Sequence, residues 1–155
     1  MLDPHKPKTL LENDMTSMTS DEKQKFLAGL HVGVLAIAEP GRGPLTVPVW
    51  YAYEPGKDVW FITGKSSRKG KLLKKGTRVS LVAQTEAPPY KYVSVEGAVT
   101  AIAPADAGRH TKPMAIRYLG EKEGARYAAQ SSGDDDSVVV SFKPESWLAV
   151  DYNKR

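Results

Sequence analysis

The sequence has 155 residues, with 22 Lys and Arg against 18 Asp and Glu, and it contains no cysteine. The length favours one domain, because domains commonly have about 100–150 residues. The lack of cysteine excludes thiol catalysis, disulfides and cysteine-ligated metals. No apolar run approaches the roughly 20 residues of a membrane span. We therefore expect a cytoplasmic protein without a membrane partner.

The chain begins with a polar segment followed by a short helix. Residues 1–19 show no sustained periodicity, so we expect an N-terminal arm ahead of a domain formed by residues 20–155. Thr19-Ser20-Asp21-Glu22 supplies capping residues before the apolar Leu27 and Leu30. This pattern predicts an amphipathic helix of about three turns.

Three strands are expected next, at residues 31–38, 45–53 and 59–63, because each run is rich in branched or aromatic residues and turn residues separate them. Short turns between consecutive strands favour an antiparallel meander. Pro48 interrupts the second run and cannot donate to a neighbouring strand. We therefore expect Pro48 at an edge, a bulge or a break that faces a ligand.

The rest of the chain alternates between strand and helix patterns. Lysines surround Leu72 and Leu73, which favours a short helix between Ser66 and Gly76. Pro113 is expected to interrupt a later helical stretch. The remaining expected elements, in order, are strands at 78–84 and 90–103, helices within 106–130, an acidic loop at 131–136, and strands at 137–142 and 146–152. About six strands with a few short helices predict a mainly β fold, a small closed barrel.

Positive charge is concentrated in one segment between Asp58 and Glu86, which contains no acidic residue. This asymmetry indicates an anionic partner, and a solvated basic face is the alternative. Nucleic acid is disfavoured because the cations are confined to one short stretch. The cations of the segment are Lys65, Arg68, Lys69, Lys71, Lys74, Lys75 and Arg78.

Within this segment, the run from Ile62 to Leu73 passes from a strand end through hydroxyls and a glycine into a cationic helix start. Backbone N–H groups, hydroxyls and the helix dipole can all face one anion there. Arg68 adds a bidentate fork and Lys69 a point charge. We therefore expect a phosphate-binding turn, and the alternative is a helix N-cap followed by an exposed basic face.

Other chemistries find little support. His5, His31 and His110 are scattered, and nothing places a serine beside a histidine and a carboxylate, so a hydrolytic triad is not expected. Asp134-Asp135-Asp136 lacks the alternating ligands of a calcium loop and is expected to be a solvated acidic turn. Walker-type and Rossmann glycine loops are absent. We assign no metal site and no catalytic residue.

Six segments taken in order resemble a known family: residues 34–37, 43–51, 59–63, 67–73, 78–81 and 92–97. Together they are similar to the pyridoxamine 5′-phosphate oxidase-like FMN-binding split-barrel superfamily, and within it to the flavin/deazaflavin (F-420)-dependent oxidoreductases. The resemblance covers residues 20–152.

This resemblance implies a six-stranded antiparallel split β-barrel, which forms a homodimer with two cofactors in clefts between the subunits. The implied activity transfers a hydride from reduced cofactor to a small unsaturated acceptor, and a cofactor-binding protein without turnover is the alternative. The residues carried over are Pro48, Val49 and Trp50 beside the cofactor ring, Ile62 and Thr63 on the next strand, Ser67, Arg68 and Lys69 at the phosphate, and Gln84 under the ring.

The resemblance leaves coenzyme F-420 and FMN as the two candidate cofactors. Deazaflavin-using members often have an arginine two residues before the lysine that matches Lys69, whereas this chain has Ser67 there and Arg68 one position later. Extra lysines at positions 65, 71, 74 and 75 favour F-420, because its polyglutamate tail is anionic. We therefore expect F-420, with FMN as the alternative.

Overall fold

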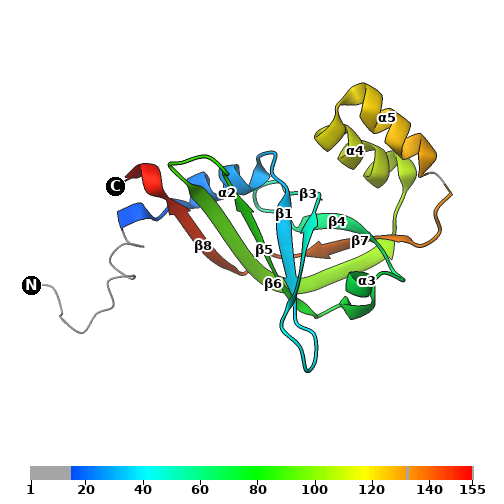
Figure 1. The fold of residues 1–155 in the computed structure, drawn as a ribbon, viewed down its shortest axis with the longest axis horizontal. Helices are drawn as coiled ribbons and strands as arrows, with labels where there is room; N and C mark the ends of the chain where they lie inside the picture. Colours follow the sequence, from blue (N-terminus) through cyan, green and yellow to red (C-terminus); the bar gives the residue numbers. More distant parts are fainter. Residues whose placement is uncertain (1–14, 132, 155) are drawn as a thin grey trace, which may run out of the picture.

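The computed structural model describes residues 15–131 and 133–154, so residues 1–14 of the expected arm, His5 among them, lie outside the described part. A curled antiparallel sheet forms its centre (Figure 1). Its strands are β1 (Gly33–Ile37), β2 (Leu45–Val49), β3 (Tyr51–Ala52), β4 (Val59–Gly64), β5 (Arg78–Gln84), β6 (Lys91–Pro104), β7 (Ser137–Phe142) and β8 (Ser146–Asp151).

Short helices lie around this sheet. They are α2 (Ser20–Ala28), α3 (Arg68–Leu72), the π-helical turn η1 (Ala107–Thr111), α4 (Lys112–Leu119), α5 (Glu121–Gln130) and the 3-10 turn η2 (Tyr152–Lys154). Helices α4 and α5 form an antiparallel hairpin that stands apart from α2 (Figure 1). No helix in the described ranges is long and apolar enough to span a membrane.

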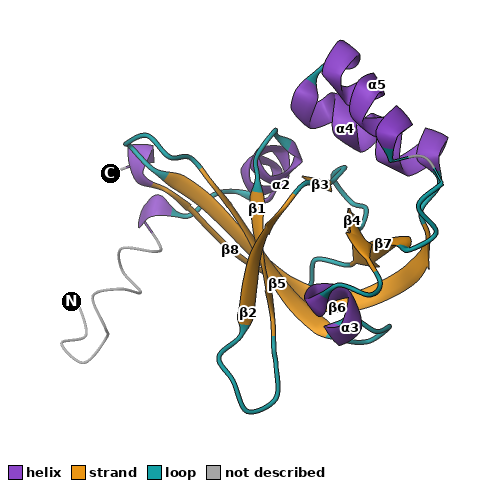
Figure 2. Cartoon of the chain, turned by 45° about the vertical axis from the view of Figure 1, so that its right-hand side comes forward, coloured by secondary structure: helices purple, strands orange, loops and turns teal. Residues whose placement is uncertain are grey.

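The strand order β2-β1-β5-β6-β7-β4-β3, with β8 also paired to β6, makes the sheet a split barrel. Figure 2 shows β1, β2, β5 and β8 on one side and β4 and β7 on the other, with β6 running across both. The two ends of the order, β2 and β3, are joined through Trp50 alone. Among the described residues no ladder pairs β2 with β3, so the barrel is closed by the chain and not by hydrogen bonds.

Strand β6 can serve both halves because it is long and changes register along its length. Its first part pairs with β5 and β8, and its last part pairs with β7 after a shift between Val99 and Ala101. At Gly97 an added Cβ would fall on the carbonyl oxygen of Lys143. Glycine is therefore required there for the close approach of two backbones.

The core lies inside the curl and follows from the alternation of the strands. Inward residues such as Leu35, Phe61 and Leu81 are fully buried. Helix α2 covers one end of the barrel with Leu27, and the Tyr51 hydroxyl donates to the Leu27 carbonyl oxygen at 2.7 Å. Burial of this single cluster is what stabilises the curled sheet.

The structure corrects the expected strand count from six to eight. The expected strand at residues 45–53 divides at Trp50, because the chain leaves β1 there and turns to pair with β4. Pro48 lies in β2, a terminal strand of the order, opposite Val34. An edge strand is where a residue without an N–H group is tolerated.

Three helix predictions are also corrected. The helix expected over residues 66–76 is only α3, because Leu73 is extended and enters the core. Helix α2 ends at Ala28, which leaves Leu30 60% exposed. Pro113 does not interrupt a helix but occupies the first turn of α4, where its missing N–H costs nothing.

Candidate functional site

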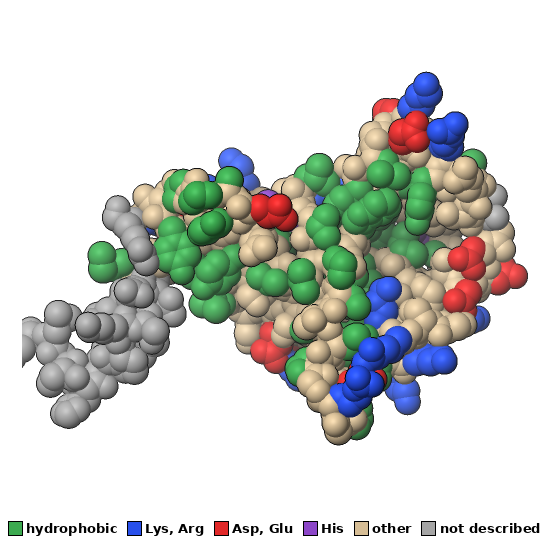
Figure 3. Space-filling model, viewed as in Figure 1, with side chains coloured by type: hydrophobic (Ala, Val, Ile, Leu, Met, Phe, Trp, Pro, Cys, Tyr) green, Lys and Arg blue, Asp and Glu red, His purple; other side chains and the backbone are tan. Residues whose placement is uncertain are grey.

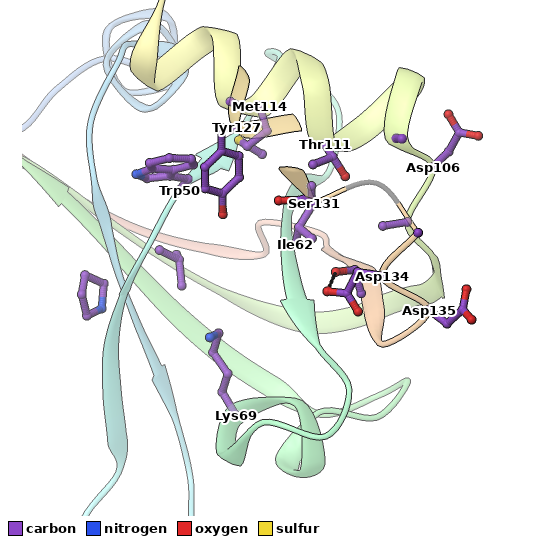
Figure 4. Close-up of a pocket in the computed structure, with 17 residues that line it drawn as sticks. Trp50, Ile62, Lys69, Asp106, Thr111, Met114, Tyr127, Ser131, Asp134 and Asp135 are labelled. Carbon is purple, nitrogen blue, oxygen red and sulfur yellow. Dashed lines mark hydrogen bonds between the residues drawn. The ribbon is translucent and has the colours of Figure 1, made fainter. Parts of the chain in front are cut away.

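A pocket of about 530 Å³ lies between the barrel and the α4–α5 hairpin (Figure 4). Its floor is the outer face of β4, with Ile62, and one wall is the end of β2 with Pro48–Trp50. Met114 and Tyr127 reach it from α4 and α5, and Lys69 reaches it from α3. The pocket therefore brings residues of β2, β4 and α3 together with residues of α4 and α5, which come much later in the chain.

Trp50 forms an aromatic wall of this pocket. Its ring is stacked on that of Tyr118, with centroids 5.1 Å apart and an interplanar angle of 5°. The ring of Tyr127 lies 5.6 Å from Trp50 and is tilted by 55°. The break between β2 and β3 thus presents an indole ring to the pocket, and α4 and α5 hold it from two directions.

The hydroxyl of Tyr118 ties α4 to the barrel at this break. It accepts a hydrogen bond from the backbone N–H of Tyr51 at 3.1 Å, and it lies 2.6 Å from the carbonyl oxygen of His31 and 3.0 Å from that of Tyr51. A barrel edge that no strand covers has unpaired backbone groups. Tyr118 satisfies these groups where β2 gives way to β3.

Arg117, the neighbour of Tyr118, makes a second set of bonds to backbone carbonyls. Its guanidinium donates to Tyr51 at 3.2 Å, to Ala28 at 3.2 Å and to Gly29 at 2.8 Å. The same side chain therefore joins α4, β3 and the end of α2. Sequence reasoning missed both residues, because their partners lie 66–89 positions away and leave no local pattern.

Of the expected phosphate turn, Lys69 is the residue that lines the pocket, and Figure 4 shows its side chain rising toward it. Ser67 caps α3: its Oγ accepts from the Gly70 N–H at 3.1 Å and donates to the Gly64 carbonyl oxygen at 2.6 Å. The buried Thr63 hydroxyl lies 3.2 Å from the same Oγ. The hydroxyls of Ser67 and Thr63 therefore form hydrogen bonds within the turn and stabilise it.

The Arg68 side chain lies against Glu39 and not in the pocket. Its Nη2 lies 2.6 Å from a carboxylate oxygen of Glu39, and the hydrogen bond from Arg68 lowers the pKa of Glu39. The pair joins α3 to the loop between β1 and β2. The positive charge of Arg68 is thus already opposed by a carboxylate, and Arg68 does not line the pocket.

Carboxylates line the opposite rim of the pocket. Asp106, Asp134 and Asp135 lie on that side in Figure 4. Figure 3 shows a group of acidic side chains at the edge where the loop after α5 lies, and a group of Lys and Arg side chains over α3 and the β1–β2 loop. Within the described residues, no group of three His, Cys, Asp or Glu side chains is arranged to hold a metal ion.

The Asp134 carboxylate serves the loop itself: it accepts from the backbone N–H of Asp136 at 2.9 Å and from the Ser137 hydroxyl at 3.1 Å. The hydrogen bond from the backbone of Arg109 lowers the pKa of Asp106. The site thus has Lys69 on one side and carboxylates on the other.

The structure divides the nine site residues expected from the sequence into two groups. Those that line the pocket are Pro48, Val49, Trp50, Ile62 and Lys69. Those outside it are Thr63, Ser67, Arg68 and Gln84, the last of which is exposed at the end of β5. Sequence reasoning missed the residues supplied by the helical region, chief among them Asp106, Thr111, Met114 and Tyr127.

The lining residues fit a flavin-like group. Pro48, Val49, Ile62 and Met114 give an apolar surface suited to a flat ring, and Lys69 offers a cation to an anionic substituent. The volume of about 530 Å³ lies within the range of small-molecule pockets.

The sequence profile of the family described as pyridoxamine 5′-phosphate oxidase matches residues 19–151. No curated protein sequence matches the chain at the required significance. Solved structures are similar over most of the chain. A conserved hypothetical protein of Mycobacterium tuberculosis has a TM-score of 0.73 and 24% identity, with 90% of this chain and 89% of that chain covered.

Two further structures carry cofactor names. An F-420 reductase has a TM-score of 0.65 and 24% identity over 80% of this chain and 94% of that chain. A FAD-binding protein of Mesorhizobium loti has a TM-score of 0.59 and 19% identity over 86% and 94%, respectively. At these identities the similarity shows the fold, which is that of a split barrel.

Proposed function

Because the chain belongs to the pyridoxamine 5′-phosphate oxidase family, we propose that it is an oxidoreductase that holds coenzyme F-420 in the pocket beneath α4 and α5. When bound, this coenzyme supplies a hydride to a small unsaturated organic acceptor. The observation that carries the proposal is the placement of Lys69 across the pocket from an apolar and aromatic wall.

In this proposal the chain's own residues bind and orient the coenzyme. Pro48, Val49 and Ile62 form the apolar surface on which a flat ring lies, and Lys69 binds an anionic substituent by a charge-assisted contact. Since Arg68 is paired with Glu39, it contributes to the position of α3 and not to the anion.

The remaining lysines near α3 suit an anionic tail that leaves the pocket. In the described part of the chain none of them forms an ion pair with a carboxylate: Lys65, Lys71, Lys74 and Lys75. Unpaired cations on one surface raise the local concentration of a polyanion. This supports F-420 with its polyglutamate tail.

An FMN-binding protein, with or without turnover, is the second candidate. Among the described residues that line the pocket, Lys69 is the one Lys or Arg. One cation is adequate for a cofactor with a single terminal phosphate, and the similar FAD-binding structure shares the fold.

We also propose, from the family resemblance, that the protein acts as a cytoplasmic homodimer with cofactor sites between the subunits.

Fluorescence titrations of the purified protein with F-420 and with FMN test the proposal. Tight binding of F-420 with weak binding of FMN is expected. The reverse would make the protein an FMN-binding member of the family. Binding of neither would overturn the proposal and return attention to an oligonucleotide ligand for the lysines around α3.

A further inference from the structure

We infer that a second cavity, at the end of the barrel covered by α2, binds a small anion that carries one aromatic ring. This cavity is called the α2 pocket below, and its volume is about 240 Å³. Among the described residues, none lines both the α2 pocket and the pocket beneath the α4–α5 hairpin, so the inference does not depend on the proposed function. The lining of the α2 pocket includes Lys23, Gln24, Tyr53, Lys57, Lys143 and Trp147.

Three lysines give the α2 pocket its charge. Lys23 comes from α2, Lys57 from the turn between β3 and β4, and Lys143 from the loop after β7. No Asp or Glu of the described chain lines this cavity. Positive charges that converge on one concave surface raise the local concentration of anions. The α2 pocket is therefore suited to a ligand with a negative charge.

The three lysines differ in how far their charge is already opposed. Lys57 lies 2.9 Å from Glu54, but the two side chains are 72% and 74% exposed, and an ion pair so exposed contributes little. Within the described ranges, Lys23 and Lys143 form no ion pair with a carboxylate. The charges of Lys23 and Lys143 are therefore available to an anionic ligand.

An aromatic ring holds Lys23 at the α2 pocket. The Nζ of Lys23 lies 5.0 Å from the centroid of the Trp147 ring, which is the distance of a cation–π contact. The Tyr53 ring lies 6.1 Å from the Trp147 ring, with an interplanar angle of 63°. The α2 pocket thus combines cations with two aromatic rings.

Hydrogen bonds fix Tyr53 in this arrangement. Its hydroxyl donates to Oε1 of Gln24 at 3.3 Å and accepts from the backbone N–H of Gly56 at 3.4 Å. Burial raises the pKa of Tyr53, so the hydroxyl stays neutral and adds no negative charge to the cavity. Because these bonds hold α2 against the turn between β3 and β4, a ligand does not have to order the α2 pocket when it binds.

The lining defines the chemical class of the ligand. Exposed lysines alone would form an ordinary solvated face, but here they share a cavity with aromatic rings. An anionic group can bind Lys23 and Lys143 by charge-assisted hydrogen bonds, while a flat ring attached to it contacts Trp147. Pockets for drug-sized ligands usually measure about 300–1,000 Å³, so a volume of about 240 Å³ favours a ligand with a single ring.

Two-dimensional NMR of the full chain, labelled with nitrogen-15 at tryptophan, tests the inference with phenyl phosphate as the ligand. We expect the indole N–H signal of Trp147 to shift, and Trp147→Phe identifies that signal. Trp60 is the internal reference, because it lines neither of the two pockets. Inorganic phosphate, which lacks the ring, and phenol, which lacks the charge, should both bind more weakly than phenyl phosphate.

Lysine variants test the charge. Lys23→Met and Lys143→Met should each raise the Kd for phenyl phosphate about three- to tenfold, because each removes one charge-assisted contact. Lys122→Met is the matched control, since it removes the same charge from an exposed position on α5 outside both pockets. Circular dichroism confirms that each variant is folded, and Lys143→Met provides the test if Lys23→Met does not fold.

The inference is overturned if the Trp147 signal does not respond to phenyl phosphate, or if inorganic phosphate or phenol binds as tightly. It is also overturned if Lys23→Met and Lys143→Met change the Kd no more than Lys122→Met does. A response confined to Trp50 would place phenyl phosphate in the other pocket and overturn it as well. Titration with F-420 tests the proposed function separately, because neither result depends on the other ligand.

Discussion

Two adjacent cations on α3 have different environments, and this difference decides which one can serve a ligand. The Arg68 guanidinium lies 2.6 Å from Glu39, whereas Lys69 lines the pocket. A cation that already has a carboxylate partner gains less from a second anion, because part of its charge is neutralised. Lys69 is therefore the residue whose replacement is most informative.

We predict that Lys69→Met raises the Kd for F-420 about tenfold or more, because one charge-assisted contact contributes roughly 1.5–3 kcal/mol. Fluorescence titration measures this change. Lys122→Met is the matched control, since it removes the same charge from an exposed position on α5 that neither lines the pocket nor lies near α3. Equal Kd values for the two variants would remove Lys69 from the binding site.

His31 gives the fold a pH dependence. Burial lowers the pKa of His31 below its usual value of 6.5, and the charge of Arg117 lowers it further, while the hydrogen bond to the Phe26 carbonyl opposes the shift. The folded state therefore binds this proton less readily than the unfolded state. Stability from this group is present above pH 6.5 and is lost as the pH falls through the folded pKa.

Urea unfolding at about pH 7.5 and about pH 5.5 should therefore give a lower free energy of unfolding at the acidic pH. The His31→Gln variant should show a smaller difference between the two pH values, since glutamine does not titrate. An unchanged difference in this variant would assign the effect to another group.

Tyr118 is expected to contribute through its hydroxyl as well as its ring. Tyr118→Phe leaves the backbone N–H of Tyr51 without its partner, which we predict lowers the free energy of unfolding by about 1–2 kcal/mol. Chemical denaturation measures the loss. Tyr90→Phe, which removes an exposed hydroxyl, should change stability little, and equal effects of the two substitutions would argue against a role for the Tyr118 network.

At the scale of elements, the α4–α5 hairpin converts a sheet face into a site. Met114 of α4 and Tyr127 of α5 line the pocket together with Ile62 on the outer side of β4. The hairpin is anchored by Arg117 and Tyr118 rather than by an extensive apolar face. Its position, and with it the shape of the pocket, depends on these few polar contacts.

The two helices of the hairpin are in close backbone contact at Gly124. An added Cβ would lie 2.5 Å from the backbone nitrogen of Ile116. We predict that Gly124→Ala lowers the free energy of unfolding by about 1–3 kcal/mol, although alanine favours a helix over glycine by about 1 kcal/mol. Urea unfolding shows whether the substitution lowers or raises the free energy of unfolding.

The exposed Ala129 of the same helix is the reference position, where Ala129→Gly should cost only the difference in helix propensity, about 1 kcal/mol. If Gly124→Ala raised the free energy of unfolding, the two helices could move apart without losing stabilising contacts.

For the whole molecule, the family resemblance predicts a homodimer with cofactor sites between the subunits. Analytical ultracentrifugation should give about twice the chain mass of 16.9 kDa. A clean monomer at the concentrations used for cofactor titration would contradict the shared-cleft arrangement. Binding of F-420 by such a monomer would place the cofactor site within one chain.

Much of the strand pattern could be read from the sequence, because β1 and β4 lie in runs rich in branched or aromatic residues that turn residues separate. The split of the second expected strand at Trp50 could not, because strand-forming residues stand on both sides of Trp50 and the interruption in the sequence is at Pro48. Only pairing with β1 on one side and β4 on the other reveals the break.

The sequence by itself determined the mainly β fold, the order of most strands and helices, and the basic segment around α3, since each depends on local periodicity or charge. Tertiary structure alone decided which of those cations reach a pocket, because the Arg68–Glu39 pair joins residues 29 positions apart. It also decided the ring contacts of Trp50 with Tyr118 and Tyr127, and the hydrogen bonds by which Tyr118 ties α4 to the barrel. Contacts between Trp50, Tyr118 and Tyr127 form only after the barrel curls and the hairpin folds over it.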